Sequence, residues 1–224
     1  MQEQKIQIVN SFSTSLWSGG STTQLAIYPP QAVYANRDFI WRISSATVED
    51  EFSTFTPLPD YNRIISVISG KVRLQHLDRE VLVSRGMTHF FDGGESTECF
   101  GRCTDFNLMM KKGLCQGSMD FVTIHCSKPV ALHSNDAMAT GAHCTCAVFA
   151  LDESISISFG GSITRCPSQS LALLENCTDV LLTAEKSANA FVCFIYCLFS
   201  VTETSNIFFS KIFPCKEVLK YIKI

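Results

Sequence analysis

The sequence contains few charged residues and no excess of basic ones. Of its 224 residues, 17% are Asp, Glu, Lys or Arg, and the formal net charge is −3 at pH 7. A surface without a positive field does not hold a phosphate backbone, so nucleic acid is excluded as an expected partner. Hydrophobic residues make up 46% of the chain, which favours a folded globular protein over a disordered one.

Long hydrophobic segments and an export signal are also missing. The first ten residues are polar and charged, without the apolar core of a signal peptide. The longest apolar run, residues 190–201, is shorter than the roughly 20 residues that span a bilayer, and it is typical of a buried strand. We therefore expect a soluble, cytoplasmic protein without a membrane partner, in which the eleven cysteines remain thiols.

The motifs of several common enzyme classes are absent. The chain has no P-loop, no G-x-G-x-x-G and no G-x-S-x-G, which excludes the nucleotide and serine-nucleophile sites that use them. Its five histidines are scattered. An alternative zinc site from His143, Cys144 and Cys146 with Cys99 and Cys103 lacks a completing C-x-x-C pair. We therefore predict no catalytic residue and no cofactor.

Short apolar and β-branched segments, separated by turn formers, make up most of the chain. The turn formers include Gly19-Gly20, Pro29-Pro30 and Gly160-Gly161. This pattern predicts an all-β protein, a sandwich or barrel, with little helix except in residues 214–222. The expected strands are residues 4–9, 24–28, 39–48, 63–69, 80–83, 105–110, 121–125, 146–151, 171–174 and 191–201.

A weak internal duplication divides the chain. Residues 65–91 and 148–190 share an order of strands and glycine turns, and the polar stretch 111–118 lies between them. We predict an N-terminal barrel over residues 1–115 and a C-terminal barrel over residues 116–210. Residues 211–224 would form a tail with a short helix.

An ordered series of motifs in the first half resembles the HutD/Ves family. That family has the patterns W-x-G-G-x-T, W-R-x-S-x-A-x-V, F-S-x-F, D-R, F-x-G-D and D-F-N-x-M. This chain departs from them at Asn62 and at Gly94, each of which replaces an aspartate. The matching residues are Trp17-Ser18-Gly19-Gly20 with Thr23, Trp41-Arg42-Ile43-Ser44 with Ala46 and Val48, Phe52-Ser53-Thr54-Phe55, Arg63, Phe91-Asp92-Gly93, and Asp105-Phe106-Asn107-Leu108-Met109.

The resemblance implies a bicupin, two cupin-type jelly-roll barrels in tandem, in a family associated with histidine utilisation or stress. Cupin enzymes hold a metal through three histidines and a carboxylate. With Gly70 aligned as the closing glycine of the first cupin motif, Arg63 stands at the carboxylate position and residues 56–59 contain no ligand. Thr97 replaces the histidine of the second motif. Because a guanidinium repels a cation, we expect a metal-free barrel.

Strand alternation places a polar set inside the first barrel. Arg42 and Ser44 share one face of their strand, and Asp105 and Asn107 share one face of theirs. With Arg63 they would bind a small carboxylate or amino-acid-like anion. The loop of Trp17, Gly19 and Gly20 would lie across the mouth, with Thr23 nearby. We therefore predict a binding protein with a regulatory or sensing role, whose natural ligand by family analogy is a formylglutamate-like acid.

Three alternatives stay open at this stage. Arg42 or Arg63 could pair with Asp105 inside a filled barrel that binds nothing, with Trp17 and Trp41 as plain core residues. The barrel could instead be a metal-free isomerase or hydrolase, with Asp105 as its general base. The chain could also form a homodimer.

Overall fold

A computed structural model of the protein describes residues 5–126, 128–134 and 142–197. Within these residues nearly every element is a β-strand, and the one helical segment is the 3-10 turn Tyr34–Asn36. No helix in the described part is long and apolar enough to cross a membrane. The predicted helix at residues 214–222 and the tail 211–224 lie outside the described residues.

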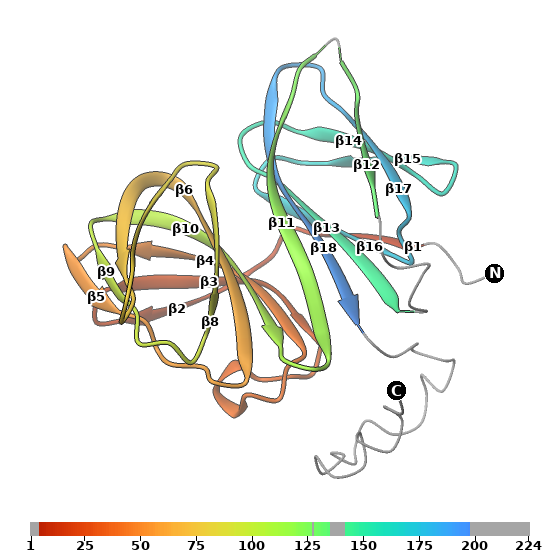
Figure 1. Ribbon diagram of the computed structural model, residues 1–224. Helices are drawn as coiled ribbons and strands as arrows, with labels where there is room; N and C mark the ends of the chain where they lie inside the picture. Colours follow the sequence, from red (N-terminus) through yellow and green to blue (C-terminus); the bar gives the residue numbers. More distant parts are fainter. Residues whose placement is uncertain (1–4, 127, 135–141, 198–224) are drawn as a thin grey trace, which may run out of the picture.

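The strands of the first half form a curled sheet that wraps into a barrel (Figure 1). Its centre is the antiparallel trio β4, β10 and β6. The long strand β6 bends after its first half, so that its second half pairs with β7 and β9 on the opposite wall. The strands of this half are β2 (Ser13–Trp17), β3 (Gly20–Tyr28), β4 (Trp41–Val48), β5 (Phe52–Thr54), β6 (Tyr61–Gln75), β7 (Glu80–Ser84), β8 (Thr88–Asp92), β9 (Glu98–Phe100) and β10 (Cys103–Lys111).

The second half repeats this plan with two facing sheets. One sheet has the order β1-β16-β13-β18-β11, and the other has the order β12-β17-β14-β15. Between them lies an apolar core of residues less than 9% exposed. The strands are β1 (Lys5–Val9), β11 (Cys115–Ile124), β12 (Val130–His133), β13 (His143–Ala150), β14 (Ile155–Phe159), β15 (Ser162–Cys166), β16 (Ser170–Glu175), β17 (Asp179–Thr183) and β18 (Ala188–Cys197).

The first strand crosses from one half to the other. Strand β1 pairs with β16, from Lys5 opposite Glu175 to Val9 opposite Leu171. Its side chains Ile6 and Ile8 pack on the core of the second half. The predicted division assigned residues 1–115 to the first barrel. It did not anticipate this pairing, because a local sequence pattern carries no information on which distant sheet edge a strand will join. The turn between β10 and β11 falls inside the predicted joint at 111–118.

The two halves also share a hydrophobic core between them. Phe106 of β10 stacks on Phe191 of β18, with ring centroids 4.6 Å apart and an interplanar angle of 7°. The ring centroid of Phe149 of β13 lies 5.5 Å from that of Phe106. These residues belong to one cluster that also contains Trp41 and Ile43, so the sheet faces of both halves bury each other's apolar side chains.

Candidate functional site

The interior of the first barrel contains a group of buried polar side chains. Arg63 and Arg42 lie in one row across the sheet, because both are opposite Met109 of the central strand β10. In the next row Asn107 lies opposite Ser44. The apolar residues that alternate with them face the shared core between the halves. All five predicted interior residues are less than 9% exposed: Arg42, Ser44, Arg63, Asp105 and Asn107.

Arg42 is held by uncharged partners. Its Nε donates to Oε1 of Gln24 at 2.9 Å, and Nη1 donates to Oγ of Ser44 at 3.0 Å. Its Cζ lies 4.4 Å from the ring centroid of Tyr34. Burial lowers the pKa of Arg42, and Arg37 beyond the Tyr34 ring lowers it further, whereas Tyr34 raises it. Two of the five N–H donors of Arg42 are therefore bonded within the sheet.

Asp105 is bonded to the backbone rather than to an arginine. Its Oδ1 accepts a hydrogen bond from the Ala46 amide at 2.9 Å. Among the described residues no arginine nitrogen lies within 4.0 Å of its carboxylate. Burial raises the pKa of Asp105 to about 6, while the Ala46 amide, Arg63 and Arg42 lower it. The alternative of a direct Arg–Asp ion pair is not what the geometry shows.

Arg63 has no polar partner in the described part of the chain. The residue is 6% exposed, and its Nε is buried without a hydrogen-bond acceptor. Its Cζ lies 4.8 Å from the ring centroid of Phe55 and 5.1 Å from that of Phe91. Burial lowers the pKa of Arg63 to about 10, so the guanidinium stays charged at neutral pH. Oδ1 of Asn107 is also buried without a partner.

The buried carboxylate predicts a pH effect on stability. The pKa of Asp105 is about 6 when folded and near 3.9 when unfolded, so the folded state binds the proton more tightly. The stability from Asp105 is therefore complete below pH 4 and is lost as pH rises to about 6, at roughly 1.4 kcal/mol per pH unit within that window. Asp105→Asn should remove this loss, so that its stability relative to wild type improves between pH 4 and pH 7.

Urea unfolding at pH 4, 5, 6 and 7 measures this difference, and the exposed Asp50→Asn variant is the control. A stability difference between Asp105→Asn and wild type that does not change with pH would contradict the assignment.

The hairpin of Trp17, Gly19 and Gly20 lies at the other end of β4 from Arg42. Gly20 is opposite Val48, six residues along β4 from Arg42, or roughly 20 Å at strand spacing. The Trp17 side chain, 38% exposed, covers Gly19: a Cβ added there would be 2.2 Å from the indole. The glycines serve the hairpin, because they let the indole and a neighbouring strand approach the backbone.

Thr23 does not share a sheet face with the buried polar group. It is opposite Ser45, on the sheet face that Arg42 and Ser44 do not share. Its hydroxyl lies 2.9 Å from that of Thr14 on the neighbouring strand β2. The motif spacing could not show this, because a bulge between Gln24 and Ala26 interrupts the alternation along β3.

Sequence reasoning missed several residues around the polar group. Gln24 and Tyr34 contact Arg42, whereas Phe55 and Phe91 contact Arg63. Phe55 and Phe91 belong to the motifs that carry the family resemblance, and their presence there was a usable signal. Nothing in the local sequence around Tyr34 indicates its contact with Arg42.

The residues present do not fit a cupin metal. The described residues contain no group of three or more His, Cys, Asp or Glu side chains that could hold a metal ion. The zinc alternative is separated in space, since Cys99 and Cys103 lie in the first barrel's core and Cys144 and Cys146 in the second's. The described cysteines are free thiols. Burial raises the pKa of Cys99 to about 11 and keeps that thiol uncharged.

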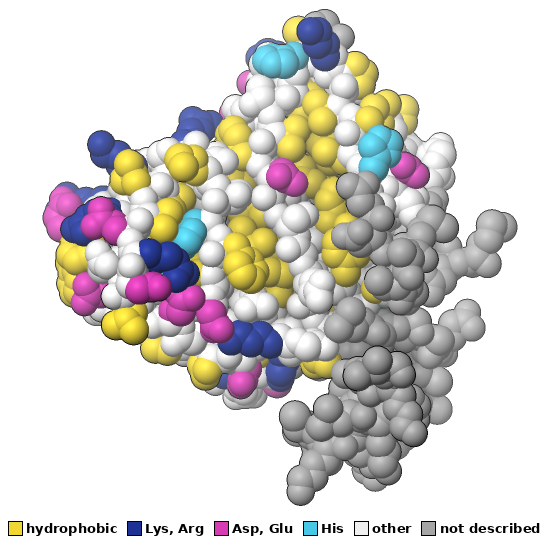
Figure 2. Space-filling view, in the orientation of Figure 1, with side chains coloured by type: hydrophobic (Ala, Val, Ile, Leu, Met, Phe, Trp, Pro, Cys, Tyr) yellow, Lys and Arg dark blue, Asp and Glu magenta, His cyan; other side chains and the backbone are white. Residues whose placement is uncertain are grey.

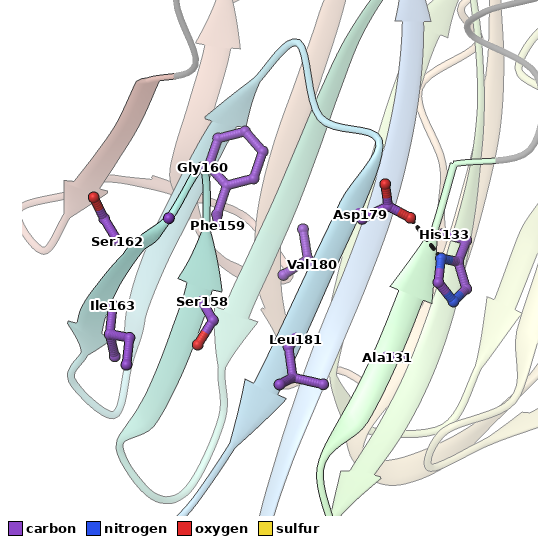
Figure 3. Close-up of a pocket in the computed structure, with 11 residues that line it drawn as sticks. Ala131, His133, Ser158, Phe159, Gly160, Ser162, Ile163, Asp179, Val180 and Leu181 are labelled. Atoms are coloured by element: carbon purple, nitrogen blue, oxygen red, sulfur yellow. Dashed lines mark hydrogen bonds and ion pairs between the residues drawn. The ribbon is translucent and has the colours of Figure 1, made fainter.

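A surface depression of about 390 Å³ lies on the second half, around strands β12, β17, β14 and β15. Figure 3 shows His133 and Asp179 at its edge, directed at each other, and Nδ1 of the histidine is 2.7 Å from the carboxylate. The rest of the lining is mostly apolar or glycine, including Ile163 and Leu181. Its two ionisable groups pair with each other, so this depression offers less to an anion than the interior around Arg63.

Comparison with known proteins agrees with the fold. The chain is similar to a conserved protein of unknown function from Pseudomonas aeruginosa PAO1, with 22% identity, a TM-score of 0.72, and coverage of 87% of this chain and 100% of that one. It is similar to HutD from Pseudomonas fluorescens SBW25, with 18% identity, a TM-score of 0.66, and coverage of 85% and 98%. The Escherichia coli pirin YhhW, solved in complex with nickel(II), has 10% identity, a TM-score of 0.62, and coverage of 86% and 98%.

These likenesses confirm the predicted all-β cupin-type fold. No curated protein matches the sequence. The sequence profile of the HutD family matches residues 9–192, which is most of the chain and includes both halves. The resemblance first seen in the N-terminal motifs is thereby confirmed, and this chain belongs to the HutD family.

Proposed function

We propose that the first barrel binds a small anionic metabolite at Arg63. The observation that carries the proposal is the unpartnered guanidinium, 6% exposed and without a hydrogen bond or ion pair to any described residue. A buried charge without a partner is costly, and a carboxylate that forms two parallel hydrogen bonds with the guanidinium would remove that cost. Lysine could not offer the same planar fork.

The surroundings of Arg63 favour an amino-acid-like acid over a bare inorganic anion. Asn107 Oδ1 is an unsatisfied acceptor on the same face, suited to an ammonium or amide N–H of the ligand. Phe55 and Phe91 would pack against a short apolar chain. Such a protein would sense or buffer an acid, and the family's association with histidine breakdown makes a formylglutamate-like acid the first candidate.

The test is a thermal-shift screen of glutamate, formylglutamate and urocanate. Wild type is expected to be stabilised by at least one of them, and Arg63→Met is expected to lose that shift while keeping its fold, because the methionine retains much of the buried volume. Arg102→Met is the matched control, since the Arg102 side chain is 65% exposed and outside the barrel. Equal ligand shifts in Arg63→Met and wild type, or none in wild type, would overturn the proposal.

A metal-free isomerase or hydrolase acting on the same acids is the second candidate. The observation in its favour is the pKa of Asp105, raised by burial to about 6, close to the value that suits a general base near neutral pH. Incubation of wild type and Asp105→Asn with formylglutamate, followed by chromatography, distinguishes the two functions. Product formed by wild type and lost in the variant would identify an enzyme.

A further inference from the structure

Two histidines inside the first barrel lie in direct contact. Nε2 of His76 and Nε2 of His89 are 2.9 Å apart. His76, which directly follows β6, is 2% exposed, while His89 on β8 is half-buried. Strand β8 runs beside β6 in the first half (Figure 1). A contact between two imidazole nitrogens requires that one donates and the other accepts.

The surrounding acceptors determine which nitrogen carries the proton. Nδ1 of His76 is 3.1 Å from Oε2 of Glu95 and 3.1 Å from Oγ1 of Thr97. The Thr97 hydroxyl donates its hydrogen to the Glu95 carbonyl oxygen at 3.2 Å, so it accepts from His76 Nδ1. Nδ1 of His76 therefore carries a hydrogen, and in the neutral ring its Nε2 must accept. The hydrogen between the rings therefore belongs to His89 Nε2. The other nitrogen of His89, Nδ1, has a lone pair and no partner among the described residues.

Proton uptake at His89 Nδ1 leaves every one of these hydrogen bonds intact. Protonation of His76 Nε2, by contrast, would put two donors 2.9 Å apart and break the contact. The exposures agree, because His89 is the ring that solvent reaches. The pair of His76 and His89 can therefore take up one proton without losing a hydrogen bond.

The imidazole pair lies next to the guanidinium of the proposed site. Phe91 is opposite Arg63, and His89 is opposite Ile65, two residues along the same strand pair. The centroid of the Phe91 ring lies 5.1 Å from Arg63 Cζ and 5.5 Å from the centroid of the His89 ring, which stacks on it at 11°. Arg63 and His89 are thus diagonal neighbours across one antiparallel strand pair, with Cα atoms roughly 7–8 Å apart.

We infer that His89, supported by His76 and Glu95, is a second anion subsite beside Arg63, and that the barrel takes a short dicarboxylate whose binding takes up a proton. One carboxylate would pair with Arg63 and the other with the imidazolium of His89. Because Arg63 and His89 are diagonal neighbours on one strand pair, acids with two or three carbons between their carboxylates are the first candidates. The inference rests on the proposed function, because it assumes that Arg63 receives an anion.

The charges around the pair set the sign of the pH effect. Glu95 faces His76, and Arg79 pairs with Glu95 at 2.8 Å, next to the exposed Asp78. Burial lowers the pKa of His89, with His76 and Arg79 lowering it further and Glu95 opposing them. The free protein therefore has a neutral pair at neutral pH. An anion beside His89 raises its pKa, so affinity for a dianion increases as pH falls, up to about tenfold per pH unit for one proton.

The deciding experiment compares glutarate with butyrate, which lacks the second carboxylate. Titration calorimetry at pH 6 and pH 8 is expected to show glutarate binding about tenfold tighter at pH 6, with butyrate nearly unchanged. His89→Gln keeps a hydrogen-bond donor but cannot take the charge, so it should abolish the pH dependence for glutarate and leave butyrate binding intact. His125→Gln, an exposed histidine in the second half, is the matched control.

The outcomes separate this inference from the proposed function. If glutarate and butyrate show the same pH dependence, or if His89→Gln retains the glutarate effect, the second subsite is overturned, while loss of butyrate binding in Arg63→Met still supports the first. If neither acid binds to wild type, the second subsite is overturned, and the thermal-shift screen of glutamate, formylglutamate and urocanate still decides the proposed function. Nitrogen-15 NMR of the imidazoles adds a readout on the unaltered protein: glutarate must raise the pH at which His89 titrates, and an unchanged titration would contradict the inference.

Discussion

Replacing Phe106 with alanine is expected to destabilise both halves of the protein together. Phe106 is 0% exposed and stacks on Phe191 at 4.6 Å, so its ring joins the sheet of the first half to that of the second. Removing a buried phenyl ring costs about 3–5 kcal/mol, through lost burial and the cavity that remains. For a chain of this size the melting temperature should fall by on the order of 10 °C.

Scanning calorimetry and urea unfolding measure this effect, with Phe90→Ala as the control. Phe90 has the same side chain but is 57% exposed on β8, so its loss should cost about 1 kcal/mol or less. Because Phe106 lies in a core formed by both halves, the variant should still unfold in one transition. Two separated transitions, with only one of them lowered, would show that the halves are independent.

Gly20→Ala is expected to be nearly as damaging, although it adds a single methyl group. The Gly20 backbone has a φ of 149°, and a Cβ built there would lie 1.9 Å from the carbonyl oxygen of Thr47. That oxygen belongs to the backbone of β4, so it cannot move without displacing the strand that contains Arg42 and Ser44. Backbone strain and the displaced strand together should cost about 3 kcal/mol or more.

Gly161→Ala isolates the clash from the effect of positive φ. Gly161 has a φ of 76°, but a Cβ there would meet nothing within 4 Å. Its substitution should cost only about 1 kcal/mol, the ordinary penalty of a left-handed conformation for an L-residue. Equal losses of stability in the two variants, measured by urea unfolding, would show that the contact with Thr47 is relieved without displacing the strand.

Surface composition is consistent with a small ligand rather than a polyanion. Figure 2 shows charged side chains of both signs intermixed over the first half on this face, without a continuous basic patch, in keeping with the net charge of −3. The buried arginines are therefore not an extension of a basic surface. Arg42 and Arg63 are 5% and 6% exposed, so their charge lies inside the barrel.

The amino-acid pattern alone was sufficient for the fold class and for which faces are buried. Arg42, Ser44, Asp105 and Asn107 follow the two-residue repeat of a strand, and the structure places all of them on the inner face. Alternation along a strand can be predicted from the sequence because it depends only on neighbouring residues. Thr23, which was proposed from the family motif rather than from alternation, lies on the other face of the sheet.

Only the tertiary structure determined the contacts between segments that are far apart in sequence. Strand β1 joins the sheet of the second half, Tyr34 covers Arg42, and His76 meets His89 between two strands. Whether Asp105 pairs with Arg63 was likewise beyond the sequence, since a shared face does not determine a distance. Long-range pairing depends on which edges and faces remain to be buried when all strands are packed, and that is a property of the whole chain rather than of any local motif.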